Sequence, residues 1–594
     1  MIRPRVMFFV APFVLAPALA VGCSTSSDNR QPFAPDAAPA PTTFEPPSCT
    51  APQTCSPDLL SVVDCEGKAT PCGPGLGCSK GACVPACEAA LAQQSTIGCE
   101  YFATVPSDVF LSQGSCYAVM IANVWNAPIE LELSWGDDRK LSTSYIRRPR
   151  GSGKNIAYEL LPEGKLPPGE IAIAFLSGRK PASDHDWEGT DCPSDVGAAI
   201  TEEAWVSNGG RGKAFHLKSS APVITYDIYP YGGAATYFPS ASLLLPVSAW
   251  GKNYVAVDGY AASPRMISGS FFPYMQIVAA EDDTTVNLLP PATLRGGPSL
   301  PDAPAGAVYT TKLARGEFLQ FAQRDEVNGT LVESDRPIAV LGGNSCADIP
   351  AGKEACDSLH QALPPIGLMG DAYVATRYRD RRSSNDTNLE IVPWRIVGVV
   401  DGTELRYDPD IPDAPKTVGR GQTIEFLAPG PFVVRSQDKA HPIYVASYMT
   451  AGNMAPYHPT AGDFTLGHGD PEFVNVVPLE QYLSSYVFLT DPTFGNTNLV
   501  FVRKAGANAK DVNLDCLGTV TGWQKVGASD YEMARIDIMF GGQPVGDCAN
   551  GAHRAWSDAP FGLTVWGFDD YASYGYVAGM SAKPLNEVRV PVVN

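Results

Sequence analysis

Basic residues are scarce in this chain. Its 594 residues include 43 Lys and Arg against 63 Asp and Glu, which gives a formal net charge of −20. Proteins that bind nucleic acid gain much of their affinity when lysine and arginine neutralise phosphates and release counterions. A chain of this charge has little of that energy available, so we expect no nucleic-acid partner. Hydrophobic residues still make up 44% of the chain, which is enough to build folded cores.

The sequence also lacks catalytic signatures. It contains no His-Glu-x-x-His zinc motif, and residues 151–155 lack the first Gly and the final Ser or Thr of a phosphate-binding loop. We therefore predict a protein that is not an enzyme and uses no cofactor. A secreted hydrolase or lyase on a propeller scaffold, working through carboxylates or histidines, is the alternative.

Two stretches of the sequence are weak metal candidates. His458, His468 and Asp470 place imidazole and carboxylate groups close together along the chain. Asp184 and Asp186 follow part of the spacing of a calcium-binding loop, in which oxygen ligands alternate. Neither stretch carries a complete ligand pattern, so polar loops are the simpler interpretation and we predict no metal.

Residues 1–22 have the composition of a bacterial lipoprotein signal peptide. A basic start is followed by a short apolar stretch and by small residues before Cys23. The stretch contains Pro12 and Pro17 and is short for a bilayer, which favours a cleaved signal over a spanning helix. We expect lipidation at Cys23, which anchors the chain to a membrane, and a tether over residues 23–48, which are rich in Pro, Ser and Ala. The expected location is the outer membrane or cell surface of a bacterium.

The 15 cysteines also fit an exported protein. Without Cys23 their number is even, which predicts disulfides throughout. Eight of them lie within residues 49–99, a segment too small to fold by apolar burial alone, so this segment predicts a disulfide-rich module whose pairing stays open. The other six fall into three pairs along the chain: Cys116 with Cys192, Cys346 with Cys356, and Cys516 with Cys548.

Residues 100–594 have the pattern of an all-β domain. Short runs of Val, Ile, Tyr, Phe and Thr are separated by Gly, Pro, Asn and Asp. An apolar run led by proline recurs at intervals of 115, 105 and 118 residues, at Pro222, Pro337, Pro442 and Pro560. A proline lacks the N–H that a central strand donates, so we expect each of these prolines at the start of its strand.

A second landmark supports the same spacing and predicts about four units of roughly 115 residues. The expected unit boundaries lie near Tyr117, Tyr254, Tyr373 and Tyr486. Each unit has length for about seven short strands, which fits either two propeller blades or one sandwich. We favour a propeller-like ring, because a closed ring protects every edge strand, and keep tandem β-sandwiches as the alternative.

Aromatic and basic clusters are the candidate ligand-binding residues. Three of the four loops that follow the proline-led runs are rich in aromatic residues and glycine, a composition common on recognition surfaces, although packing between units explains it equally well. One dense run of arginines could grip carboxylates or sulfates of a glycan, or could protect an edge strand. The candidates are Tyr229, Tyr231, Tyr237, Arg377, Arg379, Arg381, Tyr448, Tyr457, Trp566, Tyr571 and Tyr574.

Several stretches of the chain resemble the N-terminal domain family of IgGFc-binding proteins. They include "VESDRPIAVLGGNSCADIP", "HPIYVASYMT" with "GDPEFVNVVP", and "APFGLTVWGFDDYASYGYVAG", and the similarity runs from about residue 100 to 583. The cysteine-rich module with "IGCEYFA" resembles the bacterial lipoprotein branch of the family. The resemblance implies binding at a cell surface or in mucus and carries no catalytic residues; nothing in this sequence points to an antibody as ligand.

These observations together predict a lipid-anchored binding or adhesion protein that recognises an extracellular protein or glycan. An envelope component with no soluble ligand is a further possibility, because anchoring and disulfide stapling suit that role as well.

Overall fold

The structure is a computed structural model that describes residues 53–592, except for residues 57, 108–111, 137, 152–155, 180–188, 237, 265–271, 353–355, 382–388, 453–468 and 508. The described residues belong to one compact unit, residues 51–594. The predicted signal peptide, Cys23 and the tether lie outside the described residues. Among those that are described, no helix is both long and apolar enough to cross a membrane.

The cysteine-rich segment forms a small module of short strands and one helix. Its elements are β1 (Thr54–Cys55), β2 (Ser61–Val63), β3 (Ala69–Pro71), β4 (Leu76–Ser79), β5 (Ala82–Pro85) and α1 (Ala86–Gln93). Its disulfides include Cys55–Cys78, Cys72–Cys83 and Cys87–Cys99, and Cys65 is also disulfide-bonded.

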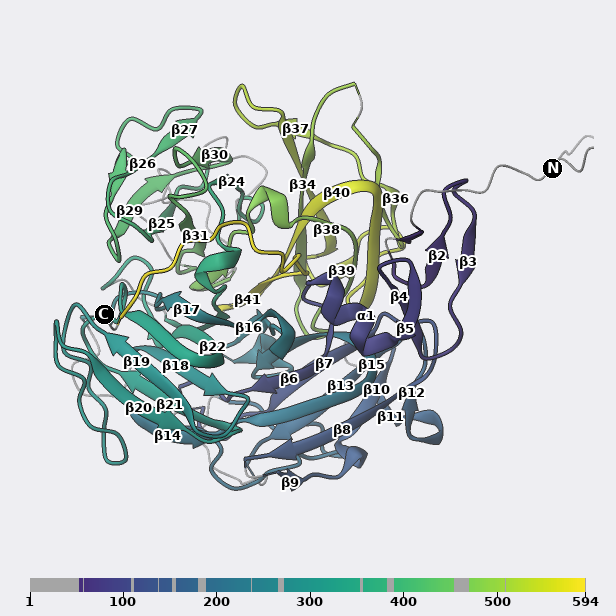
Figure 1. Ribbon diagram of the computed structural model, residues 1–594, viewed down its shortest axis with the longest axis horizontal. Helices are drawn as coiled ribbons and strands as arrows, with labels where there is room; N and C mark the ends of the chain where they lie inside the picture. Colours follow the sequence, from purple (N-terminus) through teal and green to yellow (C-terminus); the bar gives the residue numbers. More distant parts are fainter. Residues whose placement is uncertain are drawn as a thin grey trace, which may run out of the picture. The chain divides into compact units, whose positions relative to one another are not determined.

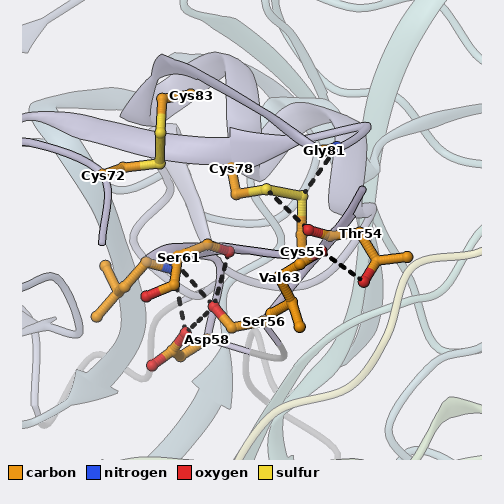
Figure 2. Close-up of a disulfide and its surroundings, with 11 residues drawn as sticks. Thr54, Cys55, Ser56, Asp58, Ser61, Val63, Cys72, Cys78, Gly81 and Cys83 are labelled. Carbon is orange, nitrogen blue, oxygen red and sulfur yellow. Dashed lines mark hydrogen bonds between the residues drawn. A yellow bond between two sulfur atoms is a disulfide. The ribbon is translucent and has the colours of Figure 1, made fainter. Parts of the chain in front are cut away.

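The first two of these disulfides fasten the hairpin β4–β5, and Figure 2 shows both beside the turn that Ser56 organises. Ser56 Oγ donates to Asp58 Oδ1 at 2.6 Å and accepts the Ser61 N–H at 2.9 Å. A segment with little apolar core is therefore held by covalent and local polar contacts.

The chain from residue 98 to 577 forms four β-sandwiches, named here sandwich 1 (98–243), sandwich 2 (251–362), sandwich 3 (372–475) and sandwich 4 (483–577). The strands of sandwich 1 are β6 (Gly98–Ala103), β7 (Tyr117–Asn123), β8 (Ile129–Trp135), β9 (Arg139–Lys140), β10 (Ile146–Arg150), β11 (Ala157–Leu160), β12 (Lys165–Leu166), β13 (Ile171–Ser177), β15 (Phe215–Tyr229) and β16 (Ser240–Leu243). Strand β14 (Gly210–Lys213) lies between them in sequence but pairs with β21 of sandwich 2.

The remaining strands follow in chain order. Sandwich 2, drawn in teal in Figure 1, contains β17 (Gly251–Val255), β18 (Pro273–Ala279), β19 (Thr284–Leu289), β20 (Tyr309–Leu313), β21 (Glu317–Ala322), β22 (Leu331–Ala347) and β23 (Asp357–Ala362). Sandwich 3 contains β24 (Ala372–Ala375), β25 (Val392–Gly398), β26 (Thr403–Glu404), β27 (Arg406–Asp408), β28 (Thr417–Val418), β29 (Thr423–Ala428), β30 (Phe432–Arg435), β31 (Ile443–Met449) and β32 (Glu472–Asn475). Sandwich 4 contains β33 (Leu483–Leu489), β34 (Asn496–Lys504), β35 (Val512–Leu514), β36 (Gly518–Thr519), β37 (Gln524–Lys525), β38 (Tyr531–Phe540), β39 (Gln543–Pro544), β40 (Ala552–Asp569) and β41 (Ala572–Val577).

Short 3-10 turns connect some of these strands. They are η1 (Thr143–Tyr145), η3 (Pro162–Gly164), η4 (Gly233–Ala235), η5 (Val247–Ala249), η6 (Ile366–Leu368) and η8 (Leu479–Gln481).

In sandwiches 1, 2 and 4 one long strand belongs to both layers of the sandwich. In sandwich 1 the first half of β15 pairs with β6 and β8, and its second half pairs with β7 and β16. The same division occurs in β22 and β40, whereas in sandwich 3 it is made by two strands, β30 and β31. The two layers enclose an apolar core, which in sandwich 1 includes Val119 and Ile121 from one layer and Leu131 and Leu133 from the other.

The recurring prolines lie at the point where the long strand passes from one layer to the other. Pro222 stands inside β15, and the pairing of β15 with β6 shifts register between Lys218 and Val223. Pro337 lies inside β22, Pro560 inside β40, and Pro442 directly before β31. The expectation that all four prolines begin their strands is therefore wrong for three of them. A residue without an N–H suits the crossing because ladder bonding is interrupted there.

A buried tyrosine fastens each crossing point. The hydroxyl of Tyr254 donates to the carbonyl oxygen of Ile338, the residue after Pro337, at 2.6 Å, and accepts the N–H of Gly251 at 2.9 Å. The equivalent hydroxyl–carbonyl pairs are Tyr101 with Val223, Tyr373 with Ile443, and Tyr486 with Phe561. The expected boundary at Tyr117 is thus displaced, because the tyrosine that occupies this position in sandwich 1 is Tyr101, on β6.

The last strands of the four sandwiches contact one another in cyclic order. Strand β16 contacts β23, β23 contacts β32, β32 contacts β41, and β41 contacts β16. The all-β class is confirmed. The expected propeller blades are not seen in the strand pairing of the described residues, which follows the β-sandwich alternative.

The three isolated cysteine pairs are formed as predicted. Cys116 is bonded to Cys192, Cys346 to Cys356, and Cys516 to Cys548. Near the C-terminus the chain contacts three distant segments. Thr96 exchanges hydrogen bonds with Met580, the Leu585 N–H donates to the Gly367 carbonyl oxygen, and the Val590 N–H donates to Asn253.

Candidate functional site

Polar side chains fill the centre where the four last strands meet. The Ser240 hydroxyl on β16 accepts the N–H of His360 on β23 at 3.0 Å, and it donates to Glu472 on β32 at 3.4 Å. Glu472 accepts the N–H of Gly575 on β41 at 3.2 Å, and Gln361 donates to the carbonyl oxygens of Ala241 and Gly575. Strands from all four sandwiches are therefore joined by hydrogen bonds that run sideways between sheets.

Three carboxyl groups are buried in this polar centre. Asp357 accepts the N–H of Ser573 at 3.2 Å, and Asp470 accepts the N–H of Gly452 at 3.1 Å. Burial raises the pKa of Asp470 to about 8 and raises the pKa of Asp357 and of Glu472 well above the usual carboxyl range. Loss of solvation is the main cause in each case, because an ionised carboxylate is costly away from water. The protonated form can also donate a hydrogen bond, which suits a sealed network.

A second polar chain borders this centre. Tyr117 donates to Asp227 at 3.0 Å, Asp227 lies 3.4 Å from His360 Nε2, and His360 Nδ1 lies 2.8 Å from the Tyr274 hydroxyl. A tyrosine, histidine and carboxylate in line can move protons in an enzyme. These four residues are at most 1% exposed, however, so a substrate in solution cannot reach them. The arrangement fits a structural network in which every member needs a partner.

The aromatic ligand candidates lie mainly in the interior. Tyr229, Tyr231, Tyr448, Trp566 and Tyr574 are each 3% exposed or less. Their contacts are internal: Tyr229 donates to the Ser112 carbonyl, Tyr448 stacks on Phe473, and Trp566 contacts the Tyr378 ring. These five side chains therefore do not form an outer binding surface. They pack between strands and between sandwiches. Tyr571 is half-buried in the turn between β40 and β41. Tyr237 and Tyr457 lie outside the described residues.

Arg377 and Arg381 of the arginine run are buried, and the partly buried Arg379 connects sandwich 3 to sandwich 4. Arg377 donates to the backbone carbonyls of Pro429 and Glu390. Arg379 forms an ion pair with Asp537 of sandwich 4 at 3.0 Å and lies between the rings of Phe540 and Phe568. Arg381 forms a buried ion pair with Glu390 at 2.7 Å. These groups have protein partners and are not free to grip a glycan.

The weak metal candidates fall mostly outside the described residues: His458, His468, Asp184 and Asp186. Asp470 belongs to the polar centre. Within the described part of the chain, one group of side chains is close enough to share an ion, and it consists of Asp515, Cys516 and His553. Cys516 is bonded to Cys548, so its sulfur is not a thiolate ligand, and two donors are too few for a built site.

Two clefts between sandwiches have room for a ligand. A cavity of about 200 Å³ lies between sandwich 1 and sandwich 4, where Tyr231, Ile173 and Leu489 line it and the paired side chains of Arg150 and Glu170 stand at its wall. A cavity of about 270 Å³ lies between sandwich 3 and sandwich 4 and carries Arg406, Arg435, Asp408 and Asp530 among its lining residues. Both clefts are made by residues far apart in the sequence.

These features define a disulfide-stapled β-protein whose sandwiches are joined by a sealed polar centre and whose ligand-accessible hollows lie at the junctions between sandwiches. A family model described as IgGFc binding protein matches residues 240–567, which is more than half of the chain. The chain therefore belongs to the IgGFc-binding protein family. The match begins at β16 and covers sandwiches 2 and 3 and most of sandwich 4, whereas the similarity expected from the sequence began at about residue 100.

One curated relative is human IgGFc-binding protein. It is 21% identical to this chain over 349 residues, which are 58% of this chain and 6% of the human protein. The chain thus spans a small part of the length of that relative.

The sequence indicated some of these residues and missed others. Asp470 is one of the weak metal candidates and Glu472 lies two residues after it, but nothing in their spacing indicates burial. Asp357 and His360 lie in "DSLHQA", in which most residues are polar, a composition more typical of an exposed segment than of a buried strand. The structure buries both faces of that strand, because the strands of neighbouring sandwiches cover the second face.

Proposed function

We propose that this chain is a lipid-anchored extracellular binding protein, with a signal peptide at 1–22, a tether at 23–48, a disulfide-rich module at 49–99 and a β-domain at 100–594. Family membership is the observation that carries the proposal, and the disulfide bonds support an oxidising compartment. The four sandwiches act as four copies of one structural unit that hold a rigid surface toward an extracellular protein or glycan.

The buried polar centre supports a binding role over a catalytic one. The side chains that resemble a proton relay are inaccessible, and the groups with raised pKa values are enclosed by the strands that join the sandwiches. Binding surfaces gain affinity from rigidity, because less conformational entropy is lost on association. A secreted hydrolase or lyase remains the alternative function, with the two clefts as its candidate sites.

The anchor and the location are tested on the full chain in a Gram-negative host. Mass spectrometry of the mature protein is expected to find an acylated N-terminal Cys23, and Cys23→Ser is expected to release the protein from membranes. Protease treatment of intact cells then separates a surface position from a periplasmic one. An unmodified Cys23 with unchanged membrane association would refute the anchor.

The binding role is tested by screening the purified mature protein against arrays of glycans and envelope proteins, with human IgG Fc as one of the ligands. We expect a glycan or an envelope protein to bind, and no saturable binding of IgG Fc. The same protein is assayed for glycosidase and lyase activity. Turnover without any array binding favours the enzymatic alternative.

A further inference from the structure

Two arginines stand directly opposite each other in the cleft between sandwich 3 and sandwich 4. Arg406 on β27 and Arg435 on β30 are register partners on neighbouring antiparallel strands, and both side chains are exposed. Like charges directly opposite on adjacent strands destabilise a sheet. The alternating residues Tyr407 and Phe432 face the core, where their rings contact at 6.0 Å, which leaves the two guanidinium groups on the side of the cleft.

The chain does not neutralise this pair. Among the described residues Arg406 has no ion pair, and the side-chain contact of Arg435 is a hydrogen bond with the neutral Tyr531 hydroxyl. Asp408, the nearest acidic residue on the same strand, has one carboxylate oxygen occupied by the N–H of Ala528 at 2.9 Å. Several other exposed arginines of this acidic chain form ion pairs with carboxylates, as Arg150 does with Glu170.

The opposite wall of the cleft has a different character. It consists of Ala528, Ser529 and Asp530 from the turn before β38 of sandwich 4. The exposed carboxylate of Asp530 is an acceptor for hydroxyl groups. The Ser529 hydroxyl is already engaged with the Val526 carbonyl at 2.6 Å. A ligand that carries an anionic group at one end and hydroxyl groups at the other matches both walls.

We propose that this cleft, named here the Arg406–Arg435 cleft, binds an acidic monosaccharide unit through its carboxylate or sulfate group. Guanidinium groups bind such oxyanions through paired, charge-assisted hydrogen bonds. The cavity of about 270 Å³ is smaller than the roughly 300–1,000 Å³ of drug-sized sites, so it holds one sugar unit rather than an oligosaccharide. The inference names a ligand class for the proposed binding function and rests on that function for the source of the glycan.

The test measures binding to the mature full-length protein by calorimetry or by ligand-observed NMR. The probes are glucuronate, N-acetylglucosamine 6-sulfate, inorganic sulfate and glucose. We expect the two acidic sugars to bind, with affinity that falls as salt rises, and glucose not to bind. Arg406→Gln and Arg435→Gln are each expected to weaken the acidic sugars at least tenfold, and Asp530→Asn to weaken the sugars but not inorganic sulfate.

Arg420→Gln is the matched control, because Arg420 is an exposed arginine of sandwich 3 outside the cleft. It is expected to leave binding unchanged. Removing one of two like charges is expected to keep or raise the thermal midpoint, so loss of binding in the cleft variants is not loss of folding.

The proposal is overturned if the Arg406→Gln/Arg435→Gln double variant binds the acidic sugars as tightly as the parent protein does. Sulfate that binds as tightly as the acidic sugars overturns the saccharide part of it. Failure of the cleft proposal can be told apart from failure of the binding function. If the double variant still binds a glycan on the array, the protein binds glycans but at a site outside this cleft.

Discussion

The hydroxyl of Tyr254 and the carbonyl oxygen of Ile338 lie 2.6 Å apart across 84 residues of sequence. This bond fixes the place where β22 leaves one layer of its sandwich and enters the other, directly after Pro337. The same hydroxyl accepts the Gly251 N–H, so a single buried oxygen ties the first strand of the sandwich to its longest strand. Tyr101, Tyr373 and Tyr486 do the same in the other three sandwiches.

Replacing this tyrosine tests the importance of the crossing point. Tyr254→Phe keeps the ring but removes the hydroxyl, which leaves the partly buried Gly251 N–H and the buried Ile338 carbonyl without that partner. The expected loss in free energy of unfolding is about 1–3 kcal/mol. Denaturant titration of the purified protein measures it. Tyr145→Phe, at a half-buried turn position, is the control and is expected to change stability by less than about 0.5 kcal/mol. A cost no larger than that of the control contradicts the anchoring role.

The buried acids predict that stability falls as pH rises. Asp470 has a pKa of about 8 in the folded protein, whereas an unfolded aspartate has its pKa near 4. The folded state therefore holds a proton that the unfolded state has released, and this stabilisation is complete below about pH 4 and is lost as pH rises to about 8. Each such carboxyl contributes a slope of about 1.4 kcal/mol per pH unit within that window.

Asp470→Asn removes the contribution of one buried carboxyl group to the slope of stability against pH. The amide stays neutral and can still accept the Gly452 N–H, so the variant is expected to lose less stability between pH 5 and pH 8 than the parent protein does. Thermal unfolding followed by circular dichroism across that range gives both slopes. The exposed Asp570→Asn serves as the matched control with unchanged slope. Identical slopes for Asp470→Asn and the parent would show that Asp470 does not titrate as a buried acid.

A buried arginine joins sandwich 2 to sandwich 3. Arg395 Nε lies 2.8 Å from Glu425 of its own sandwich, and its Nη1 lies 2.5 Å from Glu326 of sandwich 2 and 3.8 Å from Asp258. Arg395→Met keeps much of the side-chain volume but leaves these carboxylates without their cation. Arg395 is buried, but Glu326 and Glu425 are each about one third exposed, so water offsets part of the cost. The expected loss in free energy of unfolding is about 2–3 kcal/mol, below the range for a fully buried pair.

An exposed ion pair provides the comparison with the buried Arg395. Arg139 and Glu202 form an ion pair whose side chains are both more than half exposed, so Arg139→Met is expected to cost less than about 1 kcal/mol. Parallel denaturant titrations of the two variants at low and high salt check this difference. If the two variants lose similar amounts of stability, or if the loss in Arg395→Met depends on salt, then burial of Arg395 does not set the strength of its ion pairs.

Two disulfides differ in the length of chain they close. Cys116–Cys192 spans 76 residues and Cys346–Cys356 spans 10. The loop-entropy relation predicts losses of about 4.5 and about 2.7 kcal/mol when each pair is replaced by alanines. Chemical denaturation of the two double variants under oxidising conditions gives the ranking. A larger loss for the shorter loop would mean that native contacts near Cys346, rather than chain entropy, set its contribution.

Much of the local structure was predictable from the sequence, because it depends on neighbouring residues. The β-rich composition, the separate cysteine pairs and the spacing of Pro222, Pro337, Pro442 and Pro560 all point to what the structure shows in these positions. The role of the prolines was only partly predictable: a missing N–H indicates a break in a ladder, but it does not say whether the break begins a strand or lies within one.

The candidate site could not be predicted, because its members are exposed or buried according to contacts that only the tertiary structure makes. Arg381 and Arg406 look alike in the sequence, yet the first is enclosed with Glu390 and Thr450 whereas the second faces a cleft. Tyr448 and Trp566 suggested a recognition surface, because aromatic residues beside glycines occur both on such surfaces and in packed junctions.

The sequence by itself determined the all-β class, the disulfide partners along the sandwiches and the recurrence of a proline-led strand, since hydrophobic pattern, cysteine order and backbone chemistry act locally. Only the tertiary structure decided that the last strand of each sandwich is buried on both faces, that Tyr101 rather than Tyr117 fastens the first crossing, and that Arg406 and Arg435 share a cleft. The physical reason is the same for all three. Each depends on which distant strand packs against the second face of a sheet, and burial of that face determines the solvation of its side chains, their pKa values and their access to a ligand.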